Sequence, residues 1–354
     1  MKYKISLSAV KIPPEALPMM MQSMEAGLIA HSEYVERFEQ SICDYVGAKY
    51  CIAVSNGTMA DAVMVAVIKN LYPNIKRVIV PALTFIAQPN SVRYNSLEVV
   101  FADVGEDWNL DISQLYFLPE LDTMLFLTDL MGRPIHESRG MLMIEDACEA
   151  FGSKRGDAFA GTFGLMGSYS FYPSHTISTG EGGAIITDDE DLVMLCRSIR
   201  SHGAISDHPM NKFHFPNFGF NARMTTMQAV LGTAVMLHIE EYITKRREIF
   251  SMMQNAFGGF EENGDTIVPH GFPIGFTSEM ARNDAMLKIL DAGIECRKFF
   301  SCVPTDEVPY LESRRFPIAE HISRTHLYLP CHQNMTPEDV VYIAEIMSDV
   351  KDRL

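Results

Sequence analysis

Residues 167–189 read GSYSFYPSHTISTGEGGAIITDD, and this stretch decides both the expected fold and the expected place of the site. Two strand-like runs, at 169–171 and 184–187, flank a turn in which three of the four residues 180–183 are glycine. Glycine lets the backbone approach a ligand closely, so the pattern predicts a tight wrap around a bound molecule. His175 lies in this turn, where an imidazole can carry a proton or bind a metal. We expect no metal, because no second His or Cys stands at ligand spacing.

Further strand-like runs precede this stretch, at 51–54, 78–80, 99–101, 124–128 and 141–144, with helical patterns at 58–70 and 189–200. Strands that alternate with helices predict an α/β fold, with a mostly parallel sheet flanked by helices. One connection is short, since only twelve residues lie between Thr128 and Met141. A parallel crossover usually needs a dozen or more residues, mostly helical. Either these two strands are not neighbours, or a helix has been trimmed there.

A change of pattern indicates a second domain. A helical stretch runs from about 225 to 257, and beyond Gly258–Gly259 the pattern becomes α+β, with helices at 279–291 and 337–353. We place the boundary near residue 240, inside the long helix. Residues 1–240 then form a large domain that includes the N-terminal segment, and residues 241–354 form a small C-terminal α+β domain.

The composition excludes several partners. A formal net charge of −16 over 354 residues argues against nucleic acid or an anionic membrane, which both need a basic surface. A small phosphorylated ligand stays possible, because one helix N-terminus and two basic side chains can hold it. The seven cysteines are scattered without a CxxC pair, the N-terminus lacks a signal peptide, and no long apolar run appears. We therefore expect a cytoplasmic protein that does not enter a membrane.

Ligands bind at the carboxyl ends of the strands in open parallel sheets. Ser55-Asn56-Gly57-Thr58 directly follows the run at 51–54 and opens a helix. Gly57 allows close backbone approach, Thr58 supplies a hydroxyl group, and the helix N-terminus favours an anion. Taken alone, such a segment is more often a simple helix cap.

Two more strand ends carry candidate cofactor residues. Asp146 follows the run at 141–144, where a carboxylate could keep a pyridine nitrogen protonated and make the ring an electron sink; the alternative is a helix cap. Phe85 follows the run at 78–80, where its ring stacks on a flat cofactor or joins the core. Segment 219–224, GFNARM, precedes the long helix and either caps it or reaches an anion.

Taken together, the motifs along the chain resemble the DegT–StrS family of sugar aminotransferases, which are fold-type-I pyridoxal phosphate (PLP) enzymes with an aspartate-aminotransferase-like fold. The resemblance spans nearly the whole chain. It rests on collinear motifs: ERFE, SNGT, VPALTF, VFADV, IEDACEAFGS, GTFGLMGSYSF, STGEGGAIITDD, RSHG, GFNARMTTMQA, GIECRKFF and LYLP.

The resemblance implies roles for single residues. Asp146 corresponds to the partner of the pyridine nitrogen and Phe85 to the stacking aromatic residue. Gly57, Thr58 and Ser170 correspond to phosphate binders. Asn221 corresponds to a phosphate contact supplied by the second subunit, so the resemblance also implies a homodimer with shared active sites. Arg223 and Arg297 are candidates for binding the diphosphate of a nucleotide sugar, and otherwise are structural or surface arginines.

One position departs from the aminotransferases of the family. Their cofactor-binding lysine lies five residues after the serine that corresponds to Ser170, and here that residue is His175. Lys154 and Lys212 match no motif position. An imidazole cannot form the stable imine that a lysine forms, so we expect PLP or pyridoxamine phosphate (PMP) to bind non-covalently. Histidine remains a good proton carrier.

The same replacement occurs in a branch of the family, the nucleotide-sugar 3-dehydratases that act on 4-keto-6-deoxyhexoses. The resemblance to them implies that glutamate is the amino donor, that His175 is the base, and that a deoxysugar is made. Glu149, where the family's aminotransferases usually have Gln, binds the cofactor, shares the proton work or is only a hydrogen-bonding substitute. Against this reading, the C-terminal third resembles the perosamine-type 4-aminotransferases. A modified aminotransferase and a non-catalytic binding subunit therefore stay open as alternatives.

Overall fold

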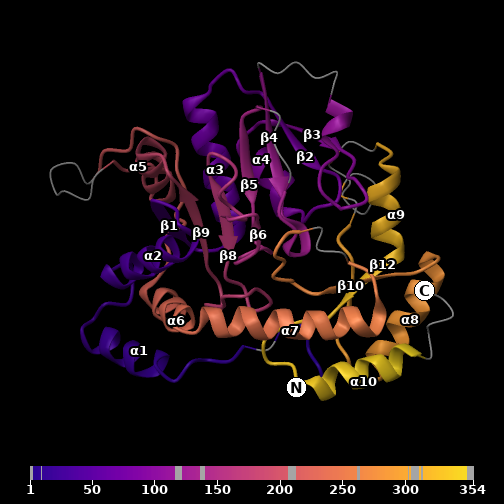
Figure 1. The fold of residues 1–354 in the computed structure, drawn as a ribbon. Coiled ribbons are helices and arrows are strands. Elements are labelled where there is room, and N and C mark those ends of the chain that lie inside the picture. The colour runs from indigo at the N-terminus through magenta and orange to yellow at the C-terminus, as the bar shows by residue number, and fades with distance from the viewer. Residues whose placement is uncertain are drawn as a thin grey trace.

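The computed structural model describes residues 3–8, 10–115, 122–135, 140–205, 213–260, 264–301, 303, 311 and 314–348. Its main feature is a seven-stranded sheet of order β1-β9-β8-β5-β4-β2-β3 (Figure 1). The strands are β1 (Tyr50–Val54), β2 (Arg77–Pro81), β3 (Glu98–Ala102), β4 (Thr123–Thr128), β5 (Met143–Asp146), β8 (Gly167–Ser170) and β9 (Gly183–Thr187). In this sheet β9 alone runs opposite to the other six strands. The predicted mostly parallel α/β sheet is confirmed.

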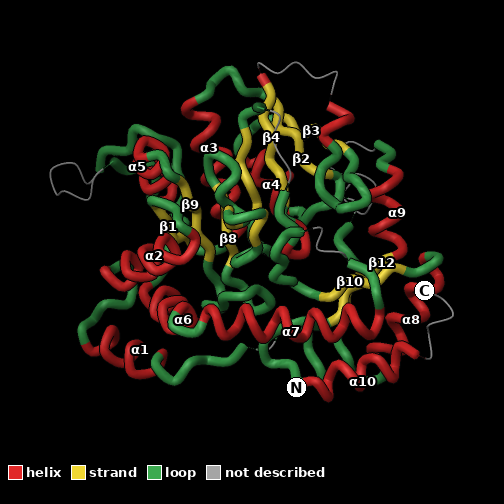
Figure 2. The backbone as a smooth tube through the Cα atoms, viewed as in Figure 1, coloured by secondary structure: helices red, strands yellow, loops and turns green. Residues whose placement is uncertain are grey.

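Helices cover both faces of the sheet (Figure 2). One face is covered by α3 (Gly57–Leu71), α4 (Ala87–Tyr94) and α5 (Glu190–Arg200), and the other by α2 (Glu33–Val46) and α6 (Thr226–Met236). Successive residues of a strand point to opposite faces, so a sheet covered on both sides requires unbroken apolar runs. β4 is such a run, since all six of its residues are buried.

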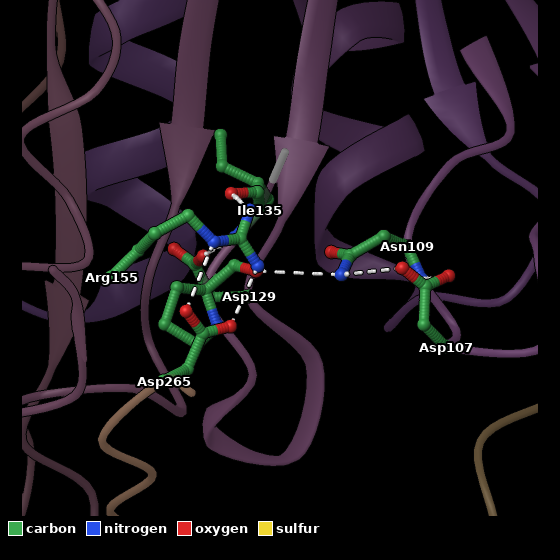
Figure 3. A network of polar contacts seen from close by, with 7 residues as sticks. Asp107, Asn109, Asp129, Ile135, Arg155 and Asp265 are labelled. Atoms are coloured by element: carbon green, nitrogen blue, oxygen red, sulfur yellow. Dashed lines mark hydrogen bonds and ion pairs between the residues drawn. The ribbon is translucent and has the colours of Figure 1, made fainter. Parts of the chain in front are cut away.

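The connection from β4 to β5 explains the short crossover. The two strands are parallel neighbours, and the described part of the connection forms only a three-residue 3-10 turn, η3 (Leu130–Gly132). Side chains hold the chain that follows it (Figure 3). The Asp129 carboxylate accepts a hydrogen bond from the Ile135 N–H at 2.6 Å, and Arg155 donates to the Ile135 carbonyl while it pairs with Asp265 at 2.8 Å. Of the two alternatives, the trimmed helix is correct.

The single helix predicted over 225–257 is wrong. α6 ends at Met236, and α7 (Ile239–Phe257) begins after His238, whose φ of −117° and ψ of 12° are not helical. Gly232 stays helical inside α6. The ring of Phe38 packs against it and occupies the space that a Cβ would need.

α7 runs from beside α6 toward α8 (Figure 1) and passes from one hydrophobic cluster to another. Near its start, Ile239 and Ile243 pack in the cluster between the large sheet, α2 and α6. Near its end, Phe250 and Met253 pack in the cluster of the C-terminal part. One continuous helix therefore belongs to both halves of the molecule.

The C-terminal part is built around a small antiparallel sheet of order β10-β12-β11. It comprises β10 (Phe272–Gly275), β11 (Arg297–Lys298) and β12 (His326–Leu329), with α8 (Glu279–Asp291), α9 (Pro317–Thr325) and α10 (Pro337–Ser348). Smaller elements elsewhere are α1 (Ala16–Glu25), η1 (Ile112–Leu115) and the hairpin of β6 (Lys154–Arg155) and β7 (Ala158–Phe159). The α+β character predicted for this part is confirmed.

The domain boundary near residue 240 stays a proposal. The N-terminal segment contacts the C-terminal part, because Ile5 forms a β-bridge to Ile294 and packs in the same cluster. Among the described residues, no helix combines the length and the apolar character that a membrane span requires.

Candidate active site

The first part of the site is a backbone cradle at the carboxyl ends of β1 and β8, defined here as Asn56, Gly57, Thr58, Ser170 and Gly183. Asn56 caps α3, since its side chain accepts the Met59 N–H at 2.9 Å. A helix cannot bond its own first N–H groups, so those of Gly57 and Thr58 are available to an anion. The segment is thus a cap that also offers an anion site, and the two interpretations of it are compatible.

Close backbone contacts hold the cradle together. A Cβ on Gly57 would lie 2.8 Å from both the Ser170 Cβ and the Cys148 Sγ. A Cβ on Gly183 would lie 2.5 Å from the carbonyl carbon of Asn56 and 2.7 Å from the Gly57 nitrogen. No larger residue fits at either position without a shift of its neighbours. The structure therefore brings together Gly57, Thr58 and Ser170, which the sequence predicted as phosphate binders.

Asp146 lies beside the cradle, at the end of β5. It is 7% exposed and accepts the Cys148 N–H at 3.1 Å. Burial raises its pKa, and burial together with the Asp146 charge raises the pKa of Asp61 on α3 well above the usual range. One carboxyl oxygen of Asp146, one carboxyl oxygen of Asp61 and the Cys148 Sγ lie within 4.8 Å of one another. Among the described residues no cationic side chain forms an ion pair with Asp146, so a protonated ring nitrogen would supply the missing charge.

Three titratable side chains form the second part of the site, the acid–base group: Glu149, His175 and His270. The Glu149 carboxylate accepts the Met131 N–H at 2.8 Å and lies 3.6 Å from Nε2 of His270. The rings of His270 and His175 have centroids 5.0 Å apart. The sequence predicted a site at Glu149 and His175 and gave no role to His270.

Burial shifts the pKa values of the acid–base group in opposite directions, up for Glu149 and down for the two histidines. Burial raises the pKa of Glu149 to about 8, so this carboxyl group is largely protonated at neutral pH. Burial and the charge of Arg246 lower the pKa of His175 to about 3, so its imidazole is neutral. Burial also lowers the pKa of His270 well below its ordinary value. Titratable groups whose pKa values are driven apart are suited to act as acid and base in one reaction.

Arg246, from the middle of α7, contacts the backbone at or next to both histidines. Its guanidinium group donates to the carbonyl oxygen of His175 at 3.3 Å and to that of Pro269 at 2.8 Å, and it contacts the Gln333 side-chain oxygen at 3.1 Å. Arg246 is 2% exposed, and burial lowers its pKa to about 10. No carboxylate of the described residues pairs with it, so its charge acts on the neighbouring imidazoles.

Aromatic and imidazole rings line the site in a continuous arc. Neighbouring centroids are 5.0 to 6.5 Å apart, in the order Phe85, Phe300, Tyr328, His270, His175 and Tyr172. Phe85, predicted to stack on the cofactor, is 54% exposed and is therefore not a core residue. An arc of flat faces can receive a pyridine ring, the apolar face of a sugar or a nucleobase.

The remaining candidates lie at the edges of the site. Arg297 is the cross-strand partner of Tyr328, which places it beside the ring arc, and its side chain is 55% exposed. Arg223 forms a β-bridge with Val54, just before the cradle. Asn221 is exposed and pairs with Ser201. These positions leave their substrate and partner-subunit roles as predictions.

Lys154 does not take the place of the lysine that the family's aminotransferases carry. Lys154 is on β6, with its ammonium group over the Phe159 ring at 4.1 Å. Lys212 lies outside the described residues. In the turn that follows Ser170, the side chain that belongs to the acid–base group is His175.

Several residues of the site were missed by sequence reasoning: Arg246, His270, Phe300 and Tyr328. Phe300 and Tyr328 belong to the motifs GIECRKFF and LYLP, which carried the resemblance but suggested no role. Arg246 lies in KRRE, a pattern typical of an exposed helix face, and His270 belongs to no motif. Only the three-dimensional fold reveals these two.

Known proteins share this arrangement of the chain. The pattern of the DegT/DnrJ/EryC1/StrS aminotransferase family matches residues 11–348. A GDP-perosamine synthase of Caulobacter vibrioides is 30% identical over 374 residues, 98% of each chain. A GDP-4-keto-6-deoxy-D-mannose 3-dehydratase of Yersinia pseudotuberculosis is 27% identical, over 92% of this chain and 93% of the relative. The crystal structure of a GDP-4-keto-6-deoxymannose-3-dehydratase with a trapped PLP-glutamate geminal diamine matches with a TM-score of 0.87 at 25% identity, over 97% and 100% of the two chains.

Fold and site together define a PLP-dependent protein of the α/β class. The sheet, the cradle and the buried Asp146 are the elements that such a cofactor requires. The chain belongs to the DegT/DnrJ/EryC1/StrS aminotransferase family, whose members use PLP or PMP with nucleotide-sugar substrates and glutamate. The aspartate-aminotransferase-like fold inferred from the sequence is confirmed.

The residues present fit this cofactor. The cradle segments approach this closely because Gly57 and Gly183 lack side chains, and the N–H groups that open α3 stay within it. Asp146 is a buried carboxylate that faces no cation of the described residues, as a pyridinium partner should be before the cofactor binds. Gly57, Thr58 and Ser170 would hold the phosphate, Asp146 the ring nitrogen and Phe85 the ring face.

Proposed function

We propose that this chain is a PLP/PMP-dependent nucleotide-sugar 3-dehydratase that acts on a nucleotide-linked 4-keto-6-deoxyhexose in deoxysugar biosynthesis. One observation carries the proposal: a neutral imidazole, His175, and a protonated carboxyl group, Glu149, belong to the same small group of side chains. Loss of water from a sugar requires a base that accepts a proton from carbon and an acid that protonates the leaving hydroxyl group. The acid–base group offers both at neutral pH.

The cofactor would supply an electron sink and, in its amine form, a reactive nitrogen for the C4 ketone of the sugar. Asp146 would hold the proton on the pyridine nitrogen, and the cradle would anchor the phosphate. His175 would accept a proton at one imidazole nitrogen, and Glu149 would donate one toward the C3 hydroxyl oxygen. The ring arc would restrict water, and Arg297 and Arg223 would bind the diphosphate.

Non-covalent cofactor binding is part of the proposal, because His175 stands in the lysine position. Borohydride treatment followed by intact mass measurement provides a test that needs no substrate. We expect no stable mass gain on any lysine. A gain equal to the reduced cofactor would contradict this part of the proposal.

We also propose a homodimer with shared active sites. The segment before Asn221 exposes Phe213 at 84% and Phe218 at 88%, and Leu17 and Met24 of α1 are 64% and 59% exposed. Large exposed apolar side chains that occur in groups usually mark an interface. Light scattering after size exclusion should give twice the chain mass of 39.7 kDa, and a monomer at micromolar concentration would contradict the dimer.

The decisive experiment compares products. The protein is incubated with PLP, glutamate and a panel of GDP-, UDP- and dTDP-linked 4-keto-6-deoxyhexoses, and mass spectrometry separates 3-deoxy-4-keto from 4-amino products. We expect the 3-deoxy product, and a loss of about 10²–10⁴-fold in His175→Asn. His175→Lys should shift the product toward the 4-amino sugar, because an ε-amine can recapture the cofactor.

The alternative is a 4-aminotransferase-like enzyme with an altered mechanism, favoured by the 30% identity to a GDP-perosamine synthase. It would replace the first proposal if the wild-type protein yields only the 4-amino sugar. Cofactor binding without any product across the panel would instead favour the non-catalytic interpretation.

A further inference from the structure

His270 occupies a position that the proposed reaction does not yet use. It lies in the loop before β10, is 8% exposed, and comes from the C-terminal part of the chain. On one side its Nε2 is 3.6 Å from the Glu149 carboxylate, and on the other its ring centroid is 5.0 Å from that of His175. His270 therefore stands between the proposed acid and the proposed base.

Each of the two imidazoles has one ring nitrogen without a hydrogen-bond partner among the described residues. Nδ1 of His175 and Nδ1 of His270 are buried, and neither has a hydrogen-bond partner among the described residues. A buried polar atom without a partner costs free energy, so such atoms are rare unless they serve a function or bind a molecule. Two of them on adjacent rings provide positions through which a proton can pass.

Arg246 fixes the two rings relative to each other. The same guanidinium group binds the carbonyl oxygen of His175 and that of Pro269, the residue before His270. The turn after β8 and the loop before β10 are thereby tied to one side chain of α7. The 5.0 Å separation of the rings thus depends on one side chain that contacts both backbones.

Titratable and charged groups face the two rings from four further segments. Glu149 faces His270 from the loop after β5, Arg246 faces both rings from α7, Arg297 acts from β11, and Tyr328 contacts His270 from β12. Tyr172 contacts His175 within its own turn. Arg246 disfavours a lasting positive charge on both rings and Arg297 does so on His270, so a proton that arrives on an imidazole tends to move on.

We infer that His270 is a positioning residue that returns the proton from His175 to Glu149 after each turnover. This inference rests on the proposed function. In the reaction His175 gains one proton and Glu149 loses one, which leaves an imidazolium and a carboxylate. Transfer from His175 to His270, and from His270 to the Glu149 carboxylate, restores both starting forms with no net proton gained or lost.

A titration that needs no substrate tests the connection. The full-length protein, with and without PLP, is labelled at histidine Cε1 with ¹³C and titrated from pH 5 to 9 by NMR. We expect the His270 resonance to change as Glu149 titrates, near pH 8, and the His175 resonance to follow it. Glu149→Gln should remove the change from both resonances, and His270→Gln should remove it from His175.

The controls separate a connection from general effects of substitution. His326→Gln removes a half-buried histidine that contacts Trp108 and Phe299 rather than the acid–base group, and it should leave both resonances unchanged. If the change on His175 persists in folded His270→Gln, the inference is wrong. If that variant does not fold, Glu149→Gln still decides, since a pH-8 change that survives it does not come from Glu149.

Turnover supplies an independent measurement. His270→Gln should lower kcat by about 10- to 100-fold, less than the loss of the base itself, with KM for the sugar nearly unchanged. A KM effect with unchanged kcat would indicate substrate binding and overturn the inference. If the titration succeeds while the sugar assay shows no dehydration, the connection stands and the proposed function fails.

Discussion

The cradle and the acid–base group lie in the same site but are assembled in different ways. The cradle comes from two segments, at 56–58 and 170–183, which approach closely because Gly57 and Gly183 have no side chains. The acid–base group combines three side chains from separate loops, tied by Arg246 from a fourth segment. Backbone geometry follows local sequence, whereas the protonation of Glu149 and His175 depends on burial by the whole fold. Binding the cofactor and handling protons should therefore be separable by mutation.

The largest expected effect tests the buried carboxylate beside the cradle. Asp146→Asn removes the group that keeps a pyridine nitrogen protonated, so turnover should fall by about 10³-fold or more, ~4 kcal/mol of barrier, while the fold is kept. Stopped-flow or product assays measure the loss.

The matched control is Asp61→Asn, the same substitution at the neighbouring buried acid. Burial and the neighbouring Asp146 charge raise the pKa of Asp61, which favours its protonated form, and an amide resembles a protonated carboxyl group in shape. We expect turnover within a factor of about 3 of wild type, under ~1 kcal/mol. Equal losses in both variants would show that general disturbance of the buried acids, rather than the role of Asp146, limits the reaction.

A smaller effect tests the cradle itself. Gly183→Ala places a methyl group 2.5 Å from the carbonyl carbon of Asn56, and overpacking of this kind costs about 1–3 kcal/mol. PLP affinity, measured by absorbance titration, should weaken by about 10- to 100-fold. Gly180→Ala adds the same methyl group in the same turn where nothing lies within 4 Å, although its φ of +84° makes alanine strained there. A loss of affinity as large in Gly180→Ala would mean that strain rather than the clash disturbs the cradle.

The smallest effect concerns stability and probes the acid–base group. The native protein holds the Glu149 proton up to about pH 8, whereas the unfolded chain loses it near the ordinary value of 4.5. The stabilisation is therefore complete below pH 4.5 and is lost as the pH rises toward 8. Glu149→Gln does not titrate, so its thermal midpoint should decline less from pH 5 to 8, by several degrees at roughly 1–2 °C per kcal/mol for a chain of this size. Parallel decline in both proteins would show that Glu149 is not protonated in the native state.

The sequence predicted the strands well because their signal is local. All seven runs that belong to the large sheet were identified. The break between α6 and α7 was missed because no Pro or Gly marks Leu237 or His238. The visible candidate, Gly232, stays helical owing to its contact with Phe38.

The residues of the site also divide into those with a local sequence signal and those without one. Gly57, Asp146, Ser170 and His175 follow strand ends, and the alternation of elements places strand ends together. His270 and Arg246 are separated from them by 71 to 213 residues, with no pattern that links them. Their contacts arise from the path of α7 and of the loop before β10, which only packing determines.

The course of α7 has a mechanical consequence. The helix has 19 residues, about 28 Å at ~1.5 Å per residue, and Arg246 lies where it leaves one hydrophobic cluster and enters the other. If the C-terminal cluster loosens, the far half of α7 frays and the anchor of His175 and His270 is lost, while the cradle keeps its own contacts. Gentle heating or low denaturant should therefore produce molecules that still hold the cofactor but have lost proton transfer. Local unfolding of α7 should therefore stop catalysis at a lower temperature or denaturant concentration than the one that releases the cofactor.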